Sequence, residues 1–174
     1  NILPKLKEYF DSQVLLAAAN EVAVSDPSLA YEMTACHINL PKLPIVVNGG
    51  EQWVCDTTYY VFMCQAGIYA YQAERYEDAI AALKMLNAEK NQANAQRNVL
   101  IYANQYLFQI YIEQKDTTNA IATLKACIEE YPEDPWFTQN LINLYISAGD
   151  NAKAIEFLDM ASNREPNVGQ YQMI

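Results

Sequence analysis

The stretch that decides the fold is Leu141–Pro166, "LINLYISAGDNAKAIEFLDMASNREP", because a close copy of it stands earlier in the chain. The copy, "LFQIYIEQKDTTNAIATLKACIEEYP", begins at Leu107, 34 residues before Leu141. The residues shared at matching positions include Leu107/Leu141, Tyr111/Tyr145, Asp116/Asp150, Ala120/Ala154, Leu124/Leu158 and Pro132/Pro166. A fixed interval of this length is typical of stacked helical hairpins.

The spacing of the shared residues predicts two helices in each copy. Leu107 and Tyr111 are four residues apart, so they share one face of a first helix. Ala120, Leu124 and Cys127 share one face of a second helix, and the small Ala120 lets the two helices approach closely.

The residues between and after these helices are those that begin and end helices. Asp116 and Asp150 stand where each second helix starts and are candidate N-caps. Pro132 and Pro166 end the second helices, because proline cannot continue a helix.

These residues resemble the tetratricopeptide repeat (TPR) family, whose unit is 34 residues long. With Pro135 as position 1, the family's preferred positions 11, 15, 20, 24, 27 and 32 are occupied by Tyr145, Gly149, Ala154, Leu158, Ala161 and Pro166. Two positions depart from the pattern: Ile142 replaces a small residue at position 8, and Thr138 replaces Trp at position 4.

The same frame extends towards the N-terminus. Gly67, Ala79, Leu83 and Leu86 fit positions 8, 20, 24 and 27 of an earlier unit, and a weaker unit surrounds Ala30. The resemblance therefore implies an all-α fold, a TPR-like right-handed superhelix of about four antiparallel helix pairs.

We expect the following organisation. Residues 1–41 form a degenerate first helical hairpin, residues 42–56 an insertion, and residues 57–174 three repeats at about 60–93, 101–134 and 135–168 with a partial C-terminal helix. That last helix either caps the array or continues in a longer protein.

The insertion has two alternatives. Two short β-prone runs flank Asn48-Gly49-Gly50, which is a hairpin turn signal. We favour an irregular loop, because an isolated hairpin is marginally stable in water.

The composition argues against several functions. With 21 Asp and Glu against 11 Lys and Arg, the net charge of −10 repels nucleic-acid backbones and anionic lipid. No apolar stretch is long enough for membrane insertion.

No catalytic or cofactor pattern stands out. The single histidine, His37, neighbours Cys36, and adjacent helical residues cannot form a nucleophile–base pair. Cys36, Cys55, Cys64 and Cys127 have no zinc-binding spacing, and phosphate-binding and nucleophile-elbow motifs are absent from the sequence. We therefore expect no enzyme activity, no metal and no cofactor.

The TPR resemblance implies a concave groove lined by the first helices. Its expected peptide-binding residues are Tyr71, Gln72, Tyr102, Gln105, Gln109, Trp136, Gln139, Asn140 and Asn143, with Val61, Cys64, Gln65, Ile68 and Tyr106 at further groove positions. This set contains no Lys or Arg, which the carboxylate-clamp mode of the family would need. Amides and aromatic rings instead suit the main chain of a peptide. The alternative for each aromatic residue is packing between helices.

The favoured function is a non-enzymatic scaffold that binds a peptide segment or partner protein in this neutral groove. The alternative is a structural spacer or self-assembly segment of a longer protein, with self-association through the array ends. The acidic, amide-rich repeats with an insertion are similar in style to TPR proteins of bacterial envelopes. This likeness favours the periplasm or cell envelope over the cytoplasm.

Overall fold

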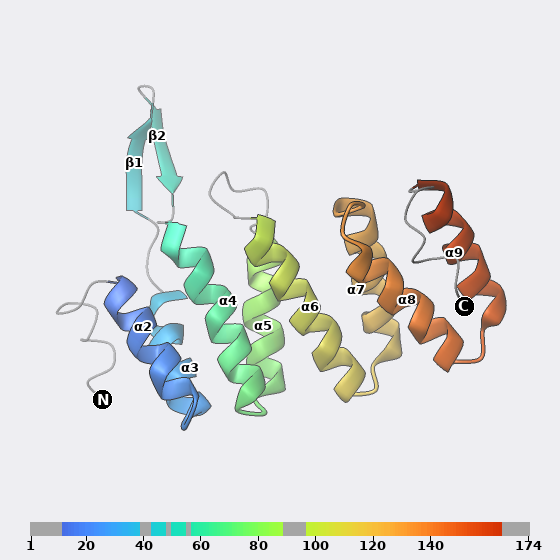
Figure 1. Ribbon diagram of the computed structural model, residues 1–174. Coiled ribbons are helices and arrows are strands. Elements are labelled where there is room, and N and C mark those ends of the chain that lie inside the picture. Colours follow the sequence, from blue (N-terminus) through green and yellow to red (C-terminus); the bar gives the residue numbers. More distant parts are fainter. Residues whose placement is uncertain (1–11, 39–42, 48–49, 55–56, 89–96, 165–174) are drawn as a thin grey trace. The chain divides into compact units, whose positions relative to one another are not determined.

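The computed structural model describes residues 12–38, 43–47, 50–54, 57–88 and 97–164 (Figure 1). The chain divides into two compact units, residues 1–110 and residues 111–174. The boundary falls inside α6, Arg97–Glu113.

Most of the described residues form helices. Their bounds are α2 Ser12–Ala23, α3 Pro27–Ile38, α4 Thr57–Gln72, α5 Tyr76–Ala88, α6 Arg97–Glu113, α7 Thr117–Glu130, α8 Pro135–Ser147 and α9 Asn151–Arg164. The predicted all-α class is confirmed. The expected partial C-terminal helix lies outside the described residues.

The insertion is an antiparallel hairpin and not the irregular loop that we favoured. Strand β1, Leu43–Val47, pairs with β2, Gly50–Val54, in a register that sets Leu43 opposite Val54 and Val47 opposite Gly50. The β-branched run Ile45-Val46-Val47 favours an extended chain, and the paired main-chain groups satisfy one another. The argument from hairpin instability was therefore wrong for this segment.

Three helix ends share one turn, and its central residue stands at position 15 of the three predicted repeats that begin near residues 60, 101 and 135. Glu74, Lys115 and Gly149 all have positive φ, at 59°, 58° and 74°. In each case the following residue's N–H donates to a carbonyl five residues earlier, as from Arg75 to Ala70 O at 2.8 Å. This pair of features is the Schellman motif, which ends a helix and reverses the chain. The same turn therefore follows α4, which lies before residue 97, as well as the later helices α6 and α8.

The helices that follow these turns are capped largely as predicted. Asp116 accepts a hydrogen bond from Asn119 N at 3.1 Å, and Asp150 accepts one from Lys153 N at 3.2 Å. Asp26 plays the same part for α3, through Leu29 N at 2.9 Å. The side-chain oxygen satisfies a main-chain donor that the helix itself leaves without a partner.

Arg75 stands where the other repeats have the capping aspartate. Its Nε donates to Asp78 Oδ2 at 2.8 Å, and its guanidinium carbon lies 4.3 Å from the ring centroid of Tyr31 on α3. The second repeat thus has no capping aspartate at this position. Arg75 instead makes a cation–π contact with Tyr31 of the first repeat.

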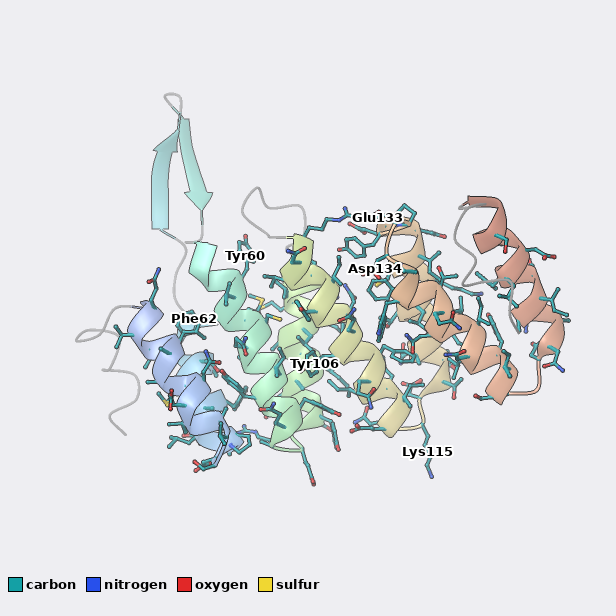
Figure 2. The ribbon with its side chains drawn as sticks, in the orientation of Figure 1. Tyr60, Phe62, Tyr106, Lys115, Glu133 and Asp134 are labelled. Carbon is teal, nitrogen blue, oxygen red and sulfur yellow. The ribbon has the colours of Figure 1, made fainter. Side chains whose placement is uncertain are left out.

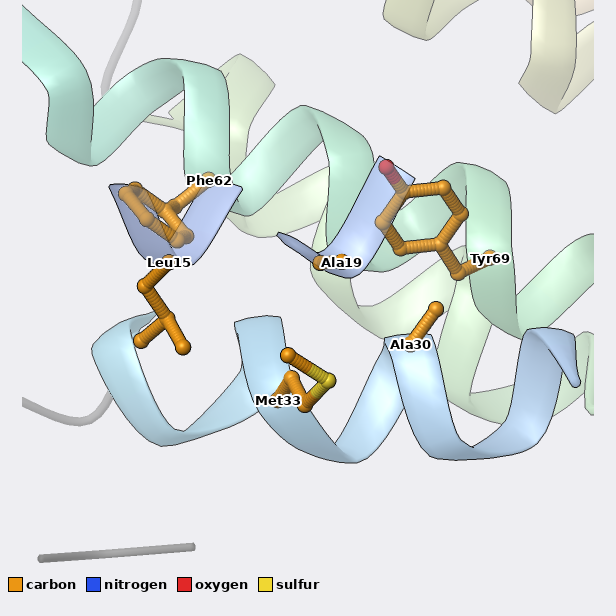
Figure 3. Packing of buried hydrophobic residues seen from close by; sticks show 6 residues of the cluster. All are labelled: Leu15, Ala19, Ala30, Met33, Phe62 and Tyr69. Carbon is orange, nitrogen blue, oxygen red and sulfur yellow. The ribbon is translucent and has the colours of Figure 1, made fainter. Parts of the chain in front are cut away.

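The core of the first unit is built from α2, α3 and α4. Leu15 and Ala19 of α2, Ala30 and Met33 of α3, and Phe62 and Tyr69 of α4 form one buried cluster (Figure 3). Alanines at the helix crossings bring the helices close enough for the larger side chains to interlock.

The close approach of α4 to α5 depends on Gly67. A Cβ atom at this position would lie 2.6 Å from both Cγ and Cδ2 of Leu83. Leu83 is fully buried, so it has little room to move. Gly67 at position 8 is therefore packed directly against Leu83 at position 24.

The second unit has its own apolar interior. Phe137 and Leu141 of α8 are fully buried, as is Leu124 of α7. Tyr145 stacks on Phe157 of α9, with ring centroids 5.7 Å apart. These contacts hold α8 between α7 and α9.

Candidate functional site

The first unit contains a pocket of about 330 Å³ whose walls come from α2, α4 and α6. These three are the first helices of successive repeats. The lining residues are Asn20, Ala23 and Val24 from α2 and its end, Gln65, Ile68, Tyr69 and Gln72 from α4, and Tyr106 from α6. First helices are also those that the TPR resemblance leads us to expect in a binding groove.

One wall of the pocket is held by a hydrogen bond between two repeats. The hydroxyl of Tyr69 donates to Oδ1 of Asn20. Tyr69 is almost completely buried, and burial raises the pKa of its hydroxyl. Because Oδ1 of Asn20 is engaged, the Asn20 amide presents its Nδ2 donor to other groups.

The remaining polar groups of the pocket make no contact with protein acceptors or donors within the described residues. This holds for the side-chain amides of Gln65 and Gln72 and for the hydroxyl of Tyr106. The Tyr106 side chain projects from α6 (Figure 2), and its ring meets the edge of Tyr71 at 5.7 Å between centroids. The ring is therefore fixed by packing while its hydroxyl remains available to a ligand.

The pocket brings together some of the predicted groove residues. Gln72 lines it, as do Gln65, Ile68 and Tyr106 at the further groove positions. Tyr71 does not line the pocket, and its ring instead contacts the rings of Tyr76 and Tyr106. Cys64 is 5 % exposed, and its Sγ lies 3.8 Å from Val99 O. It is a packing residue between α4 and α6.

Three predicted residues lie elsewhere on α6. Tyr102 is 59 % exposed, Gln109 is exposed and Gln105 is half-buried. Tyr102 and Gln109 are four and three residues from Tyr106 and so share its side of the helix, whereas Gln105 is adjacent to Tyr106 and does not. None of the three lines the pocket.

The other four predicted residues lie on α8, in the second unit. Asn140 donates to Trp136 O at 2.8 Å, and Gln139 donates to Asn143 Oδ1 at 3.1 Å. Trp136 meets Phe137 edge-on at 5.2 Å between centroids. The amides of α8 are thus partly engaged within their own helix, unlike those of the pocket on α4.

Sequence reasoning did not assign Asn20, Ala23, Val24 and Tyr69 to a site. The first repeat is degenerate, so its groove positions were not counted. Counting back from Ala30 at position 20 places Asn20 at position 10, which is also the position of Tyr69 in the next repeat and is not one of the positions used to predict the groove. The bond between Asn20 and Tyr69 thus joins equivalent positions of two repeats.

The described residues show no arrangement for metal chemistry, since they contain no group of three or more His, Cys, Asp or Glu side chains that could hold a metal ion. His37 belongs to α3, but its side chain lies outside the described part, as does Cys55. Cys64 and Cys127 are buried free thiols. No described helix is both long enough and apolar enough to cross a membrane.

Comparison with known proteins supports the repeat assignment. The tetratricopeptide repeat family model matches residues 111–174, which are also the residues of the second unit. The TPR family inferred from the sequence is thereby confirmed over this part of the chain. Searches of curated proteins and of solved structures gave no match.

The family match defines a general class of function. Tetratricopeptide repeats generally mediate protein–protein interactions, and the family is typically a non-enzymatic scaffold.

Proposed function

We propose that this protein is an interaction scaffold that binds a peptide segment of a partner protein in the pocket between α2, α4 and α6. The observation that carries the proposal is a pocket where Gln65, Gln72 and Tyr106 offer hydrogen-bonding groups with no partner in the described residues. A ligand that covers these groups removes them from water. This costs free energy unless the ligand forms hydrogen bonds with them.

The amide and aromatic side chains suit a peptide better than a small charged ligand. An amide both donates and accepts hydrogen bonds, as does each peptide unit of an extended chain. The half-buried ring of Tyr106 supplies rigid contact area. The predicted residue Tyr102 on α6 is a further candidate contact of the first unit. The predicted residues on α8, Trp136 among them, are candidate contacts of the second unit, considered separately from the pocket.

The proposal is tested by affinity capture followed by mass spectrometry. The baits are the wild-type protein, an Asn20→Ala/Gln65→Ala/Gln72→Ala variant and a Gln139→Ala/Asn143→Ala variant. The control bait is Gln114→Ala, which removes an exposed amide from the turn after α6. Circular dichroism and thermal midpoints establish that each bait is folded.

We expect a partner that the wild-type and control baits retain and that the pocket variant loses. If the α8 variant also fails to retain the partner, α8 takes part in binding. Equal recovery on all four baits would reject the pocket. In that case, a mass that rises with concentration in analytical ultracentrifugation would favour the self-assembly alternative.

A further inference from the structure

The spacing of the two glutamines on α4 matches a short extended chain. Gln65 and Gln72 are two helical turns apart, so they share a face and are separated by about 10 Å along the axis. Ile68 lies between them on that face. An extended chain rises about 3.3 Å per residue, so a stretch of three residues spans the distance. One peptide laid along α4 can therefore meet both amides.

The chemistry of the two amides favours an extended ligand over a helical one. The main-chain groups of a helix are bonded to each other, whereas those of an extended segment are free to pair with side chains. Neither Gln65 nor Gln72 is engaged by other described residues. Both can bond to the main chain of the ligand whatever its sequence.

Part of the pocket lining is apolar. Ile68, Ala23 and Val24 belong to it, and Val24 is 90 % exposed. Covering Val24 removes apolar surface from water, which favours an aliphatic side chain of the ligand at this point. A volume of about 330 Å³ is at the lower end for ligand pockets. It therefore suits a few residues of peptide.

The electrostatics of the pocket disfavour an acidic ligand. None of the lining residues is charged. The last turns of α2 and α4 contribute Ala23 and Gln72, and the C-terminal end of a helix carries partial negative charge. The whole chain adds a net charge of −10. A carboxylate, including a free C-terminus, would be repelled and would find no basic partner.

We infer that the ligand is an internal, extended, neutral or basic segment of a partner protein. Gln65 and Gln72 bind its main chain, and one aliphatic side chain lies over Ile68. This inference rests on the proposed function and narrows it to one ligand class.

The test uses two libraries of random nonapeptides, both N-acetylated. One library ends in a carboxamide and the other in a free carboxylate. Each is selected on immobilised wild-type protein, on Gln65→Ala/Gln72→Ala and on the Gln114→Ala control, and the bound peptides are sequenced. Fluorescence anisotropy then measures the Kd of the best peptide and of its backbone N-methylated analogues.

We expect wild type and control to select carboxamide peptides that contain one aliphatic residue and more Lys and Arg than Asp and Glu. The double variant should bind the selected peptide about tenfold more weakly or worse, because two main-chain hydrogen bonds are lost. N-methylation next to the aliphatic residue should weaken binding by about fivefold.

Two results would overturn the inference, and they are distinguishable. Selection of free-carboxylate or acidic peptides that still depends on Gln65 and Gln72 would reject the ligand class and keep the peptide-binding pocket. Absence of any selection that depends on these glutamines would reject the proposed function together with the inference.

Discussion

Asn87 of α5 and Asn104 of α6 hold each other by two reciprocal hydrogen bonds. Asn87 Nδ2 donates to Asn104 Oδ1 at 2.9 Å, and Asn104 Nδ2 donates to Asn87 Oδ1 at 3.0 Å. Asn104 also donates to Leu100 O at 2.8 Å and is 8 % exposed. It stands at position 4, where the TPR family prefers Trp. The Asn87–Asn104 pair therefore provides hydrogen bonds where the family pattern has an apolar side chain. These bonds link α5 to α6 in a defined orientation.

Removing one member of this pair should destabilise the protein. Asn104→Ala leaves the half-buried Asn87 amide without its partner, which should cost about 1–3 kcal/mol of unfolding free energy. Urea denaturation of Asn87→Ala, Asn104→Ala and the double variant gives the coupling between the two residues. We expect the double variant to lose less than the sum of the single losses, and strict additivity would contradict the mutual bond.

Gly67→Ala should destabilise the protein through a clash. The added methyl group would meet the side chain of Leu83 at 2.6 Å, and such overpacking typically costs about 1–3 kcal/mol. The measurement is the unfolding free energy in urea. In a Leu83→Ala background the space is free, so the same change should cost much less. An equal cost in both backgrounds would show that the effect comes from elsewhere.

Substitution by glycine at position 15 should stabilise the protein, whereas the same substitution inside a helix destabilises it. Glu74 and Lys115 have φ near 59° and 58°, a conformation that costs a residue with a side chain about 1 kcal/mol. The Lys115 side chain extends away from the helices (Figure 2) and is exposed, so little packing is lost on its removal.

We therefore expect Lys115→Gly to raise the unfolding free energy by about 0.5–1 kcal/mol. Gly149→Ala, at a φ of 74° with open space around it, should lower it by a similar amount. Thermal and urea unfolding of both variants provide the check. A loss of stability in Lys115→Gly would argue against the left-handed turn.

The Cys64 thiol should be inert in the folded protein. Burial raises the pKa of Cys64 from 9.0 to about 12, so almost no thiolate forms near neutral pH. In a Cys36→Ser/Cys55→Ser background, a thiol-specific disulfide reagent should react slowly until denaturant is added. Fast reaction of the native protein at pH 8 would contradict the burial of Cys64 or of Cys127.

The same pKa shift gives a pH dependence of stability. The folded state holds the Cys64 proton more tightly than the unfolded state, so this contribution is fully present below pH 9 and is lost between pH 9 and about 12. A Cys64→Ala variant should show a shallower fall of unfolding free energy over this range than its parent. Parallel curves would contradict the shifted pKa.

The N-caps and turns were accessible from sequence because they depend on near neighbours. The side chain of Asp150 accepts a hydrogen bond from Lys153 N three residues away, and Gly149 has a positive φ, which glycine adopts more easily than other residues. The insertion shows the limit of such reasoning. A general rule on isolated hairpins favoured a loop, while the paired main chain of β1 and β2 formed a hairpin.

The amino-acid sequence by itself determined the repeat, its helical pairs, their caps and the class of protein. The helices and their caps follow from contacts within a few residues of the chain, which spacings of three and four residues reveal. The repeat follows from the interval of 34 residues. The pocket was decided only by the tertiary structure. Asn20, Tyr69 and Tyr106 come from three different repeats, and insertions of unequal length separate them in sequence. Their proximity depends on how α2, α4 and α6 pack, and the spacing within one repeat does not specify that packing.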